Sequence, residues 1–132
     1  MYPIAHLLSN VLETPAAAGR PAQFAERLPR ANILEGDADF RILMDLPGVR
    51  NEDLDISVED DTLTVKAERD AAVPEGYRAR RSELAGKVTF RRSFDLGHGI
   101  DAEHISARLE HGILTVTLPK SEKAMPRRIE VK

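Results

Sequence analysis

Residues 105–118 read ISARLEHGILTVTL, and this stretch carries the strongest structural signal in the chain. Apolar side chains alternate with polar ones in both halves, at Ile105, Ala107 and Leu109 and again at Leu114, Val116 and Leu118. Alternation with a period of two is typical of β-strands with one buried face. The dipeptide His111-Gly112 between the two runs is a turn signal. The stretch therefore predicts two strands divided by a turn.

The same alternation occurs upstream. It is carried by Phe40, Ile42, Met44 and Leu46, by Leu54, Ile56 and Val58, by Leu63, Val65 and Ala67, and by Val88, Phe90, Phe94 and Leu96. Turn signals divide these runs at Leu46-Pro47-Gly48, Asp60-Asp61 and Gly97-His98-Gly99. No long amphipathic helix interrupts the strands, so we expect an all-β sandwich of two facing sheets.

Composition limits the function classes. The 132 residues fit one domain with terminal extensions, and 42% hydrophobic residues predict a packed core. The chain has no cysteine, which rules out disulfides, thiol catalysis and Cys-based zinc sites. Its net charge of −3 gives no overall attraction to nucleic acid or anionic lipid. The first Lys or Arg is Arg20 and the opening apolar stretch is too short to cross a bilayer, so we expect a cytoplasmic protein.

Residues 1–29 are interpreted as an N-terminal arm. Ile4, Leu7, Leu8, Val11 and Leu12 form one apolar stripe at helical spacing, and Phe24 belongs to a second short apolar set. A linker with two prolines and a glycine, residues 14–21, separates the stripe from the rest of the chain. We expect this arm to pack on other chains or on clients; the alternative is an ordinary helix packed on its own domain.

The alternation lapses within the domain and ends after it. Residues 67–86, inside a domain that spans 30–119, form an excursion too long for a hairpin loop and include a short strand-like piece. Residues 120–132 form a polar tail that ends in Ile129-Glu130-Val131-Lys132. An extended backbone points Ile129 and Val131 the same way, which favours docking in a partner groove. Alternatively, these two residues close the last strand of their own domain.

Arg92 is predicted to lie on the apolar side of its strand. Period two from Phe90 to Phe94 places Arg92 with them, whereas Arg91 and Ser93 face away. A guanidinium in that position needs carboxylates or backbone carbonyls as partners. The alternative is a shifted register or a side chain that reaches solvent.

Several segments together resemble the small heat-shock proteins, the α-crystallin-domain family, in the compact prokaryotic form. The segments are Ala107-Arg108-Leu109-Glu110-His111-Gly112-Ile113-Leu114, Asp45-Leu46-Pro47-Gly48-Val49 with Asp53-Leu54, Phe90-Arg91-Arg92-Ser93-Phe94-Asp95-Leu96, and Ile129-Glu130-Val131. The resemblance covers residues 30 to 132 in the right order. His111 stands where the family usually has Asn, and Gly97 stands where Pro usually follows the leucine.

The resemblance implies an immunoglobulin-like α-crystallin sandwich of seven to eight strands. It implies that the 67–86 excursion adds a strand to a neighbour's sheet to form a dimer, with Tyr77, Arg78, Arg80 and Arg92 at the interface. Ile129 and Val131 are then the anchors that join dimers into homo-oligomers. The activity implied is that of a holdase, a chaperone that binds unfolding client proteins without ATP.

Other chemistry finds little support in the sequence. Gly97-His98-Gly99-Ile100-Asp101-Ala102 fits a loose dinucleotide-binding pattern, but no βαβ unit surrounds it. His98, His104 and His111 lack the convergence that a metal site needs, and the arginines at 78, 80, 81, 91 and 92 lack the aromatic interleaving of a nucleic-acid surface. We therefore expect no enzyme activity, cofactor, metal or nucleic-acid partner. The alternative function is that of a CS-domain co-chaperone, an adaptor with a similar sandwich but without the excursion and the tail anchor.

Overall fold

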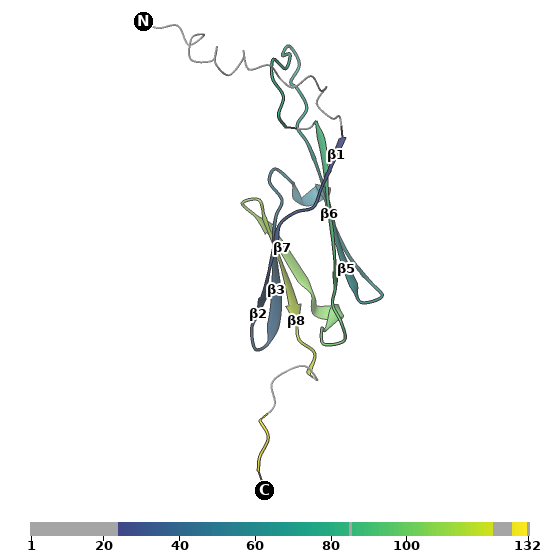
Figure 1. Ribbon diagram of the computed structural model, residues 1–132, viewed down its shortest axis with the longest axis vertical. Coiled ribbons are helices and arrows are strands. Elements are labelled where there is room, and N and C mark those ends of the chain that lie inside the picture. Colours follow the sequence, from purple (N-terminus) through teal and green to yellow (C-terminus); the bar gives the residue numbers. More distant parts are fainter. Residues whose placement is uncertain (1–23, 85, 123–127, 132) are drawn as a thin grey trace, which may run out of the picture. The chain divides into compact units, whose positions relative to one another are not determined.

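The structure, a computed structural model, describes residues 24–84, 86–122 and 128–131, with only the backbone of Phe24 (Figure 1). The chain divides into two units, of which one contains residues 1–25 and 70–88 and the other contains residues 26–69 and 89–132. The second unit holds most of the strands, the groove and the tail, and the first holds most of the excursion.

The described residues form eight strands and two short 3₁₀ helices. The strands are β1 (Phe24–Arg27), β2 (Ala31–Glu35), β3 (Asp39–Asp45), β4 (Leu54–Glu59), β5 (Thr62–Asp70), β6 (Lys87–Asp95), β7 (Ser106–Glu110) and β8 (Ile113–Pro119). The 3₁₀ helices are η1 (Asn51–Asp53) and η2 (Ala102–His104). All six strands predicted from alternation are confirmed, five of them within one residue of the expected bounds, and β5 continues three residues beyond Ala67.

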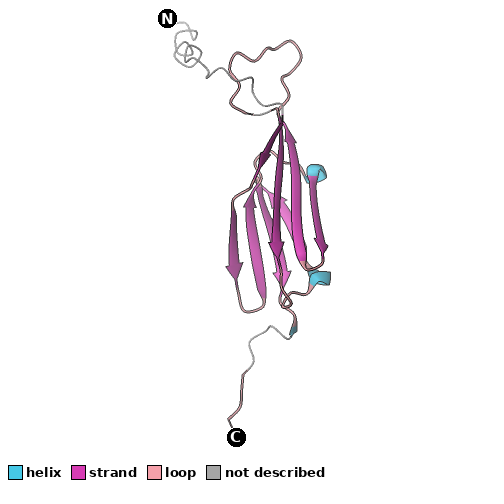
Figure 2. Ribbon diagram, turned by 45° about the vertical axis from the view of Figure 1, so that its right-hand side comes forward, coloured by secondary structure: helices cyan, strands magenta, loops and turns pink. Residues whose placement is uncertain are grey.

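The strands form two four-stranded sheets, ordered β1-β6-β5-β4 and β2-β3-β8-β7. Figure 2 shows the strands in magenta. In the second sheet, antiparallel pairing places Ile42 opposite Val116 and Met44 opposite Leu114. In the first, Ile56 pairs with Val65. The predicted all-β sandwich is confirmed.

The core is built from the alternating apolar positions of both sheets. Its buried residues are Ile42, Met44, Leu46, Val49, Leu63, Val65, Ala67, Val88, Phe90, Leu114, Val116 and Leu118. Full burial of a large aliphatic side chain contributes roughly 1.5–3 kcal/mol, so this set supplies most of the stability of the sandwich. No described polar or charged residue is buried with them.

The turns of two β-hairpins, β4–β5 and β7–β8, contain residues with a left-handed backbone conformation. Asp60 and Asp61 have φ of 50° and 60°, and His111 and Gly112 have φ of 53° and 75°. Two successive positive values define the type I′ turn, which matches the twist of paired strands. Histidine, like asparagine, is among the non-glycine residues that adopt this region most readily. His111, in place of the asparagine usual in the family, therefore still allows this turn.

The bend after β3 is fixed by backbone and side-chain contacts. Leu46 is fully buried, and its N–H donates to the Gly112 carbonyl at 2.8 Å. Gly48 has a φ of 77°, and a Cβ there would lie 2.7 Å from Arg69 Cδ. The Arg69 guanidinium passes close enough to donate to the Pro47 carbonyl at 2.9 Å. The Leu-Pro-Gly segment therefore joins the two sheets at this end of the domain.

The structure differs from the sequence interpretation at three boundaries. Residues 24–27, assigned to the arm, form strand β1 beside β6, and residues 31–35 form the unpredicted edge strand β2. Residues 67–70, assigned to the excursion, continue β5, with Ala67 fully buried. The described part of the excursion beyond Asp70 contains no strand, because a strand needs a neighbour for its backbone hydrogen bonds. Its pairing with a second chain stays a prediction.

Candidate functional site

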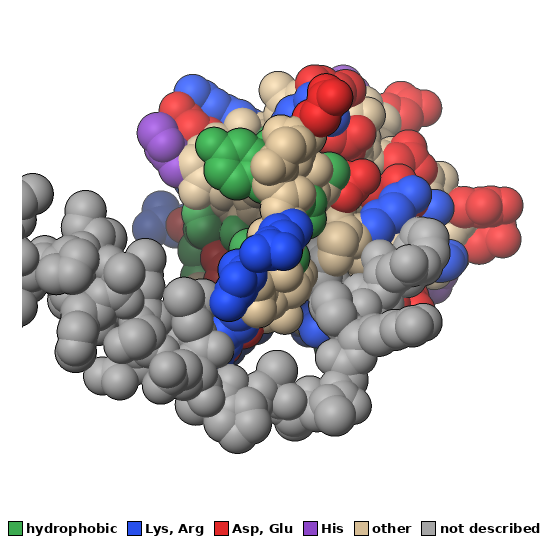
Figure 3. Space-filling view, turned by 90° about the horizontal axis from the view of Figure 1, so that it is seen from above, with side chains coloured by type: hydrophobic (Ala, Val, Ile, Leu, Met, Phe, Trp, Pro, Cys, Tyr) green, Lys and Arg blue, Asp and Glu red, His purple; other side chains and the backbone are tan. Residues whose placement is uncertain are grey.

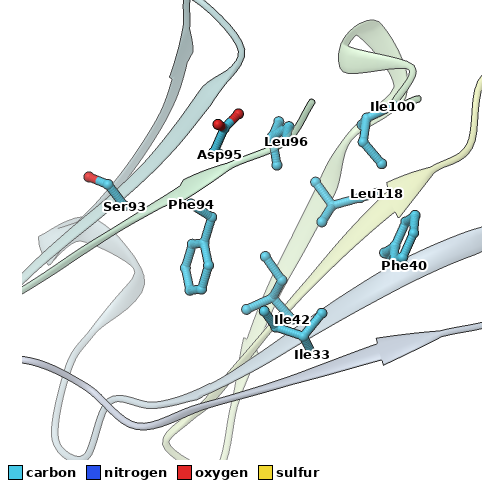
Figure 4. Close-up of a pocket in the computed structure, with 9 residues that line it drawn as sticks. All are labelled: Ile33, Phe40, Ile42, Ser93, Phe94, Asp95, Leu96, Ile100 and Leu118. Carbon is cyan, nitrogen blue, oxygen red and sulfur yellow. The ribbon is translucent and has the colours of Figure 1, made fainter. Parts of the chain in front are cut away.

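An apolar groove opens between the two sheets at one end of the domain (Figure 4). It has a volume of about 450 Å³ and its apolar lining consists of Ile33, Phe40, Ile42, Phe94, Leu96, Ile100 and Leu118. Ile42 and Leu118 form a buried floor, whereas Ile33 is 61% exposed at the edge. A groove of this size lies in the range of sites that bind small ligands or side chains.

The groove is lined by strands β2, β3, β6 and β8 and by the loop after β6. Ile33 on β2 pairs with Ile42 on β3, and Phe40 on β3 pairs with Leu118 on β8. Alternation along β6 turns Phe94 toward the cavity while Ser93 and Asp95 point away from it (Figure 4). Because apolar side chains dominate the lining, the groove is suited to aliphatic or aromatic groups.

Lys120 fixes the point where the tail leaves the sandwich. Its side chain is only 9% exposed, and its ammonium nitrogen lies 3.1 Å from the Glu35 carboxylate and 5.0 Å from the centre of the Phe40 ring. Its N–H donates to the Ala38 carbonyl at 2.8 Å, and the Ser121 N–H donates to the Gly99 carbonyl at 2.9 Å. These contacts hold the base of the tail against the β2–β3 hairpin and the loop after β6.

Arg92 lies on the inward side of β6, in the register predicted from the sequence. Along β6 the side chains of residues 88, 90, 92 and 94 are buried or half-buried. Arg91 and Ser93, between them, are exposed. Arg92 Nη1 donates to the Pro29 carbonyl at 2.8 Å, and the guanidinium carbon lies 5.2 Å from the centre of the Phe94 ring. A backbone carbonyl therefore serves as its partner, one of the two kinds expected.

The other predicted dimer residues lie in the excursion. Tyr77 is 77% exposed, and Arg78 and Arg80 are also exposed. Arg81 donates to the Glu83 carboxylate at 2.8 Å within the same segment. The role of Tyr77, Arg78, Arg80 and Arg92 at an interface stays a prediction.

The tail anchors project from the described end of the chain. Ile129 is 87% exposed and Val131 is 96% exposed. Of the arm residues, Ile4, Leu7, Leu8, Val11 and Leu12 lie outside the described residues, and the backbone of Phe24 belongs to β1.

Further apolar surface lies on the edge strand β2 and in the excursion. Ile33 and Leu34 on β2 are both more than half exposed, as are Val73 and Leu84 in the excursion. The space-filling view shows hydrophobic side chains at the surface among acidic and basic ones (Figure 3). An edge strand with exposed apolar side chains and unpaired backbone groups is a template for another chain.

Sequence reasoning missed the groove and the Lys120–Glu35 pair. The groove is assembled from residues up to 85 positions apart, Ile33 to Leu118, so no local pattern could indicate it. The one available signal was Ile100, an aliphatic residue that follows a turn and belongs to no alternating run.

No metal-binding cluster of three or more His, Cys, Asp or Glu side chains occurs among the residues that the structure describes. In the same part of the chain, no helix has the length and hydrophobicity needed to span a bilayer.

Residues 32–132 match the family model described as the Hsp20/alpha crystallin family. The chain belongs to this family. Small heat shock protein C2 of Rickettsia felis is 34% identical over 105 residues, which cover 80% of this chain and 68% of that protein. The 18 kDa heat shock protein of Streptomyces albus G is 34% identical over 127 residues, which cover 94% and 83%.

Solved structures agree with this membership. Heat shock protein 16.0 from Schizosaccharomyces pombe superposes with a TM-score of 0.64 at 32% identity, and the match covers 80% of this chain and 99% of that one. A small heat-shock protein from Xylella fastidiosa gives the same TM-score and identity over 82% and 99%, and its structure has a distinct high order arrangement. The resemblance and the α-crystallin sandwich predicted from the sequence are both confirmed, and the family is one of chaperones.

Proposed function

We propose that the chain is an ATP-independent holdase that binds partly unfolded proteins and keeps them from aggregating. The observation that carries this proposal is the amount of exposed apolar surface on a well-packed domain. The groove, β2, the excursion and the tail anchors all present aliphatic or aromatic side chains. Surfaces of this kind bind the apolar segments that unfolding proteins expose.

We propose that the working form is a homo-oligomer of dimers. The exposed edge of β2 supports strand addition by a second chain, and the excursion with Tyr77, Arg78 and Arg80 is long enough to supply the strand. Arg92 lies close to the start of β2, because it donates a hydrogen bond to the carbonyl of Pro29, two residues before that strand. The exposure of Ile129 and Val131 supports their role as anchors between dimers.

The remaining assignments follow from the same proposal. The N-terminal arm, with Ile4, Leu7, Leu8, Val11, Leu12 and Phe24, contributes to assembly and client binding. The protein acts in the cytoplasm, catalyses no reaction, and needs no cofactor. The family match supports this function over that of a CS-domain adaptor.

Light scattering tests the holdase proposal directly. A heat-labile client unrelated to this chain is warmed alone, with the chain at an equimolar ratio, and with an inert protein at the same mass concentration, all without nucleotide. We expect the chain to lower the scattering strongly and the inert protein to leave it unchanged. Equal scattering in all three samples would exclude the holdase function.

A further inference from the structure

The inward-facing rows of two strands lead from the groove to a cation. Along β6, alternation places Arg92 in line with Phe94 and, just beyond the strand, Leu96 of the lining. Along β8, the same alternation leads from Leu118 in the floor to Lys120, in the bridge that follows the strand. A guanidinium therefore precedes the apolar lining on one strand, and an ammonium follows it on the other.

These two cations differ in how their charges are balanced. The Lys120 ammonium is paired with the Glu35 carboxylate at 3.1 Å, and its side chain is only 9% exposed. The half-buried Arg92 donates to the neutral Pro29 carbonyl, and it forms no ion pair with any carboxylate among the described residues. A guanidinium has several N–H donors, so this single bond to a carbonyl leaves capacity for an acidic group.

Asp95, the acidic residue in the lining, does not offset this charge. Its carboxylate accepts a hydrogen bond from the Gly97 N–H at 3.1 Å, and Figure 4 shows it pointing away from the apolar side chains. The residue is exposed, so solvent and salt screen its charge. The groove therefore combines an apolar lining with one cation that lacks an acidic partner within the described part of the chain.

We propose that the groove binds a free fatty acid, with the alkyl chain along the lining and the carboxylate on the Arg92 guanidinium. Arginine bonds carboxylates through two parallel N–H groups, and such charged bonds are about twice as strong as neutral ones. The row from Arg92 to Leu96 covers four residue steps, about 13 Å at roughly 3.3 Å per residue, which suits a chain of medium length. This activity goes beyond the holdase function, because the ligand is a small molecule and no client takes part.

Titration calorimetry of the intact protein with decanoate, decanol and decylammonium tests the role of the head group. The three ligands share one alkyl chain, and each is kept below its critical micelle concentration. We expect decanoate to bind at one site per chain, on the order of tenfold more tightly than decanol, because only its head group is charged and accepts from Arg92. Equal affinities for decanoate and decanol, or tighter binding of decylammonium, would overturn the proposal.

A series of chain lengths tests the role of the lining. Each buried CH₂ group contributes a similar free energy, so decanoate should bind on the order of tenfold more tightly than octanoate, which has two fewer. Acetate, which has the head group without the chain, should not bind measurably. An affinity that does not change with chain length would contradict binding along the groove.

Ile33 allows the charge of the groove to be changed without disturbing the core. It is 61% exposed at the groove edge, and the neighbouring Leu34, 51% exposed, faces the other side of β2. Ile33→Glu should weaken decanoate binding by about tenfold, and Ile33→Lys should strengthen it, because charges at this edge act on the bound carboxylate. Leu34→Glu, the matched control, should leave the affinity within about twofold of the original. Equal losses in all three variants would show that the charge of the site does not matter.

Arg92→Met tests the head-group partner itself, with Arg91→Met as the control that loses the same charge from the exposed side of β6. We expect Arg92→Met to bind decanoate no more tightly than decanol, whereas Arg91→Met keeps the preference. A preference that survives in a folded Arg92→Met protein would overturn the assignment. Circular dichroism checks the fold, and the Ile33 variants decide the question if Arg92→Met does not fold. No client is present in these titrations, so their failure would leave the holdase proposal untouched.

Discussion

Arg92 shows how a charge is kept on the apolar side of a strand. Its guanidinium donates to the Pro29 carbonyl and lies over the Phe94 ring, so it is partly shielded without a carboxylate partner among the described residues. Pro29 is itself buried, which means that its carbonyl would lose a partner if Arg92 were removed. A buried acceptor left unsatisfied costs free energy.

Replacing Arg92 by Ala should therefore lower the free energy of unfolding by about 2 kcal/mol, the sum of a charged hydrogen bond and a cation–π contact. Arg91→Ala is the matched control, because it removes the same charge from an exposed position on the same strand. It should change stability by less than about 0.5 kcal/mol. Thermal or urea unfolding of both variants measures the difference. Equal stabilities would show that the contacts of Arg92 contribute nothing.

His111 occupies a backbone conformation that its side chain tolerates but does not favour. With a φ of 53° followed by Gly112 at 75°, the position requires a left-handed residue. His111→Asn should keep or raise the stability, whereas His111→Val should lower it by about 1–2 kcal/mol because a β-branched side chain is strained there. Unfolding midpoints of the two variants decide the question, and a valine variant as stable as the asparagine variant would contradict the turn assignment.

At the scale of the elements, period-two alternation predicted the strands that bury one face. Residues 113–119 and 39–45 became β8 and β3, the two central strands of one sheet, whereas residues 106–110 became its edge strand β7, on which only Leu109 is partly buried. β2 was not predicted because its sequence does not alternate. Four of its residues, Asn32, Ile33, Leu34 and Glu35, are exposed at the edge of the sheet, so neither face of the strand had to be apolar. The groove and the Lys120–Glu35 ion pair could not be predicted from the sequence, because their residues are distant along the chain and come together only in the fold.

The Lys120–Glu35 pair should couple the β2–β3 hairpin to the base of the tail. We expect a double-mutant cycle of Lys120→Met and Glu35→Gln to give a coupling energy of about 0.5–1 kcal/mol, because the ammonium is largely shielded from solvent. The control cycle is Arg108 with Glu110, an ion pair of 3.2 Å whose side chains are 77% and 53% exposed. Its coupling should be near zero. Equal coupling in the two cycles would argue against a fixed base for the tail.

At the scale of the whole molecule, the tail anchors should decide the size of the assembly. Changing Ile129 and Val131 to Ala should reduce the protein to dimers or small species, since each buried anchor contributes roughly 1.5–3 kcal/mol at every contact between dimers. Glu130→Ala lies between them and faces the other way, so it should leave the assembly intact. Native mass spectrometry compares the three proteins. An unchanged native mass for the double variant would show that Ile129 and Val131 do not hold the assembly together.

The central claim is that this member of the Hsp20/alpha crystallin family holds unfolding proteins in soluble form. Its most direct test is to heat a labile client with the chain in the absence of nucleotide, separate the soluble fraction by size, and identify both proteins in each fraction by mass. We predict that most of the client co-elutes with the chain in complexes larger than the chain's own assembly, and that added ATP changes nothing. The account is contradicted if the client is found only in the pellet while the chain elutes alone at its original size.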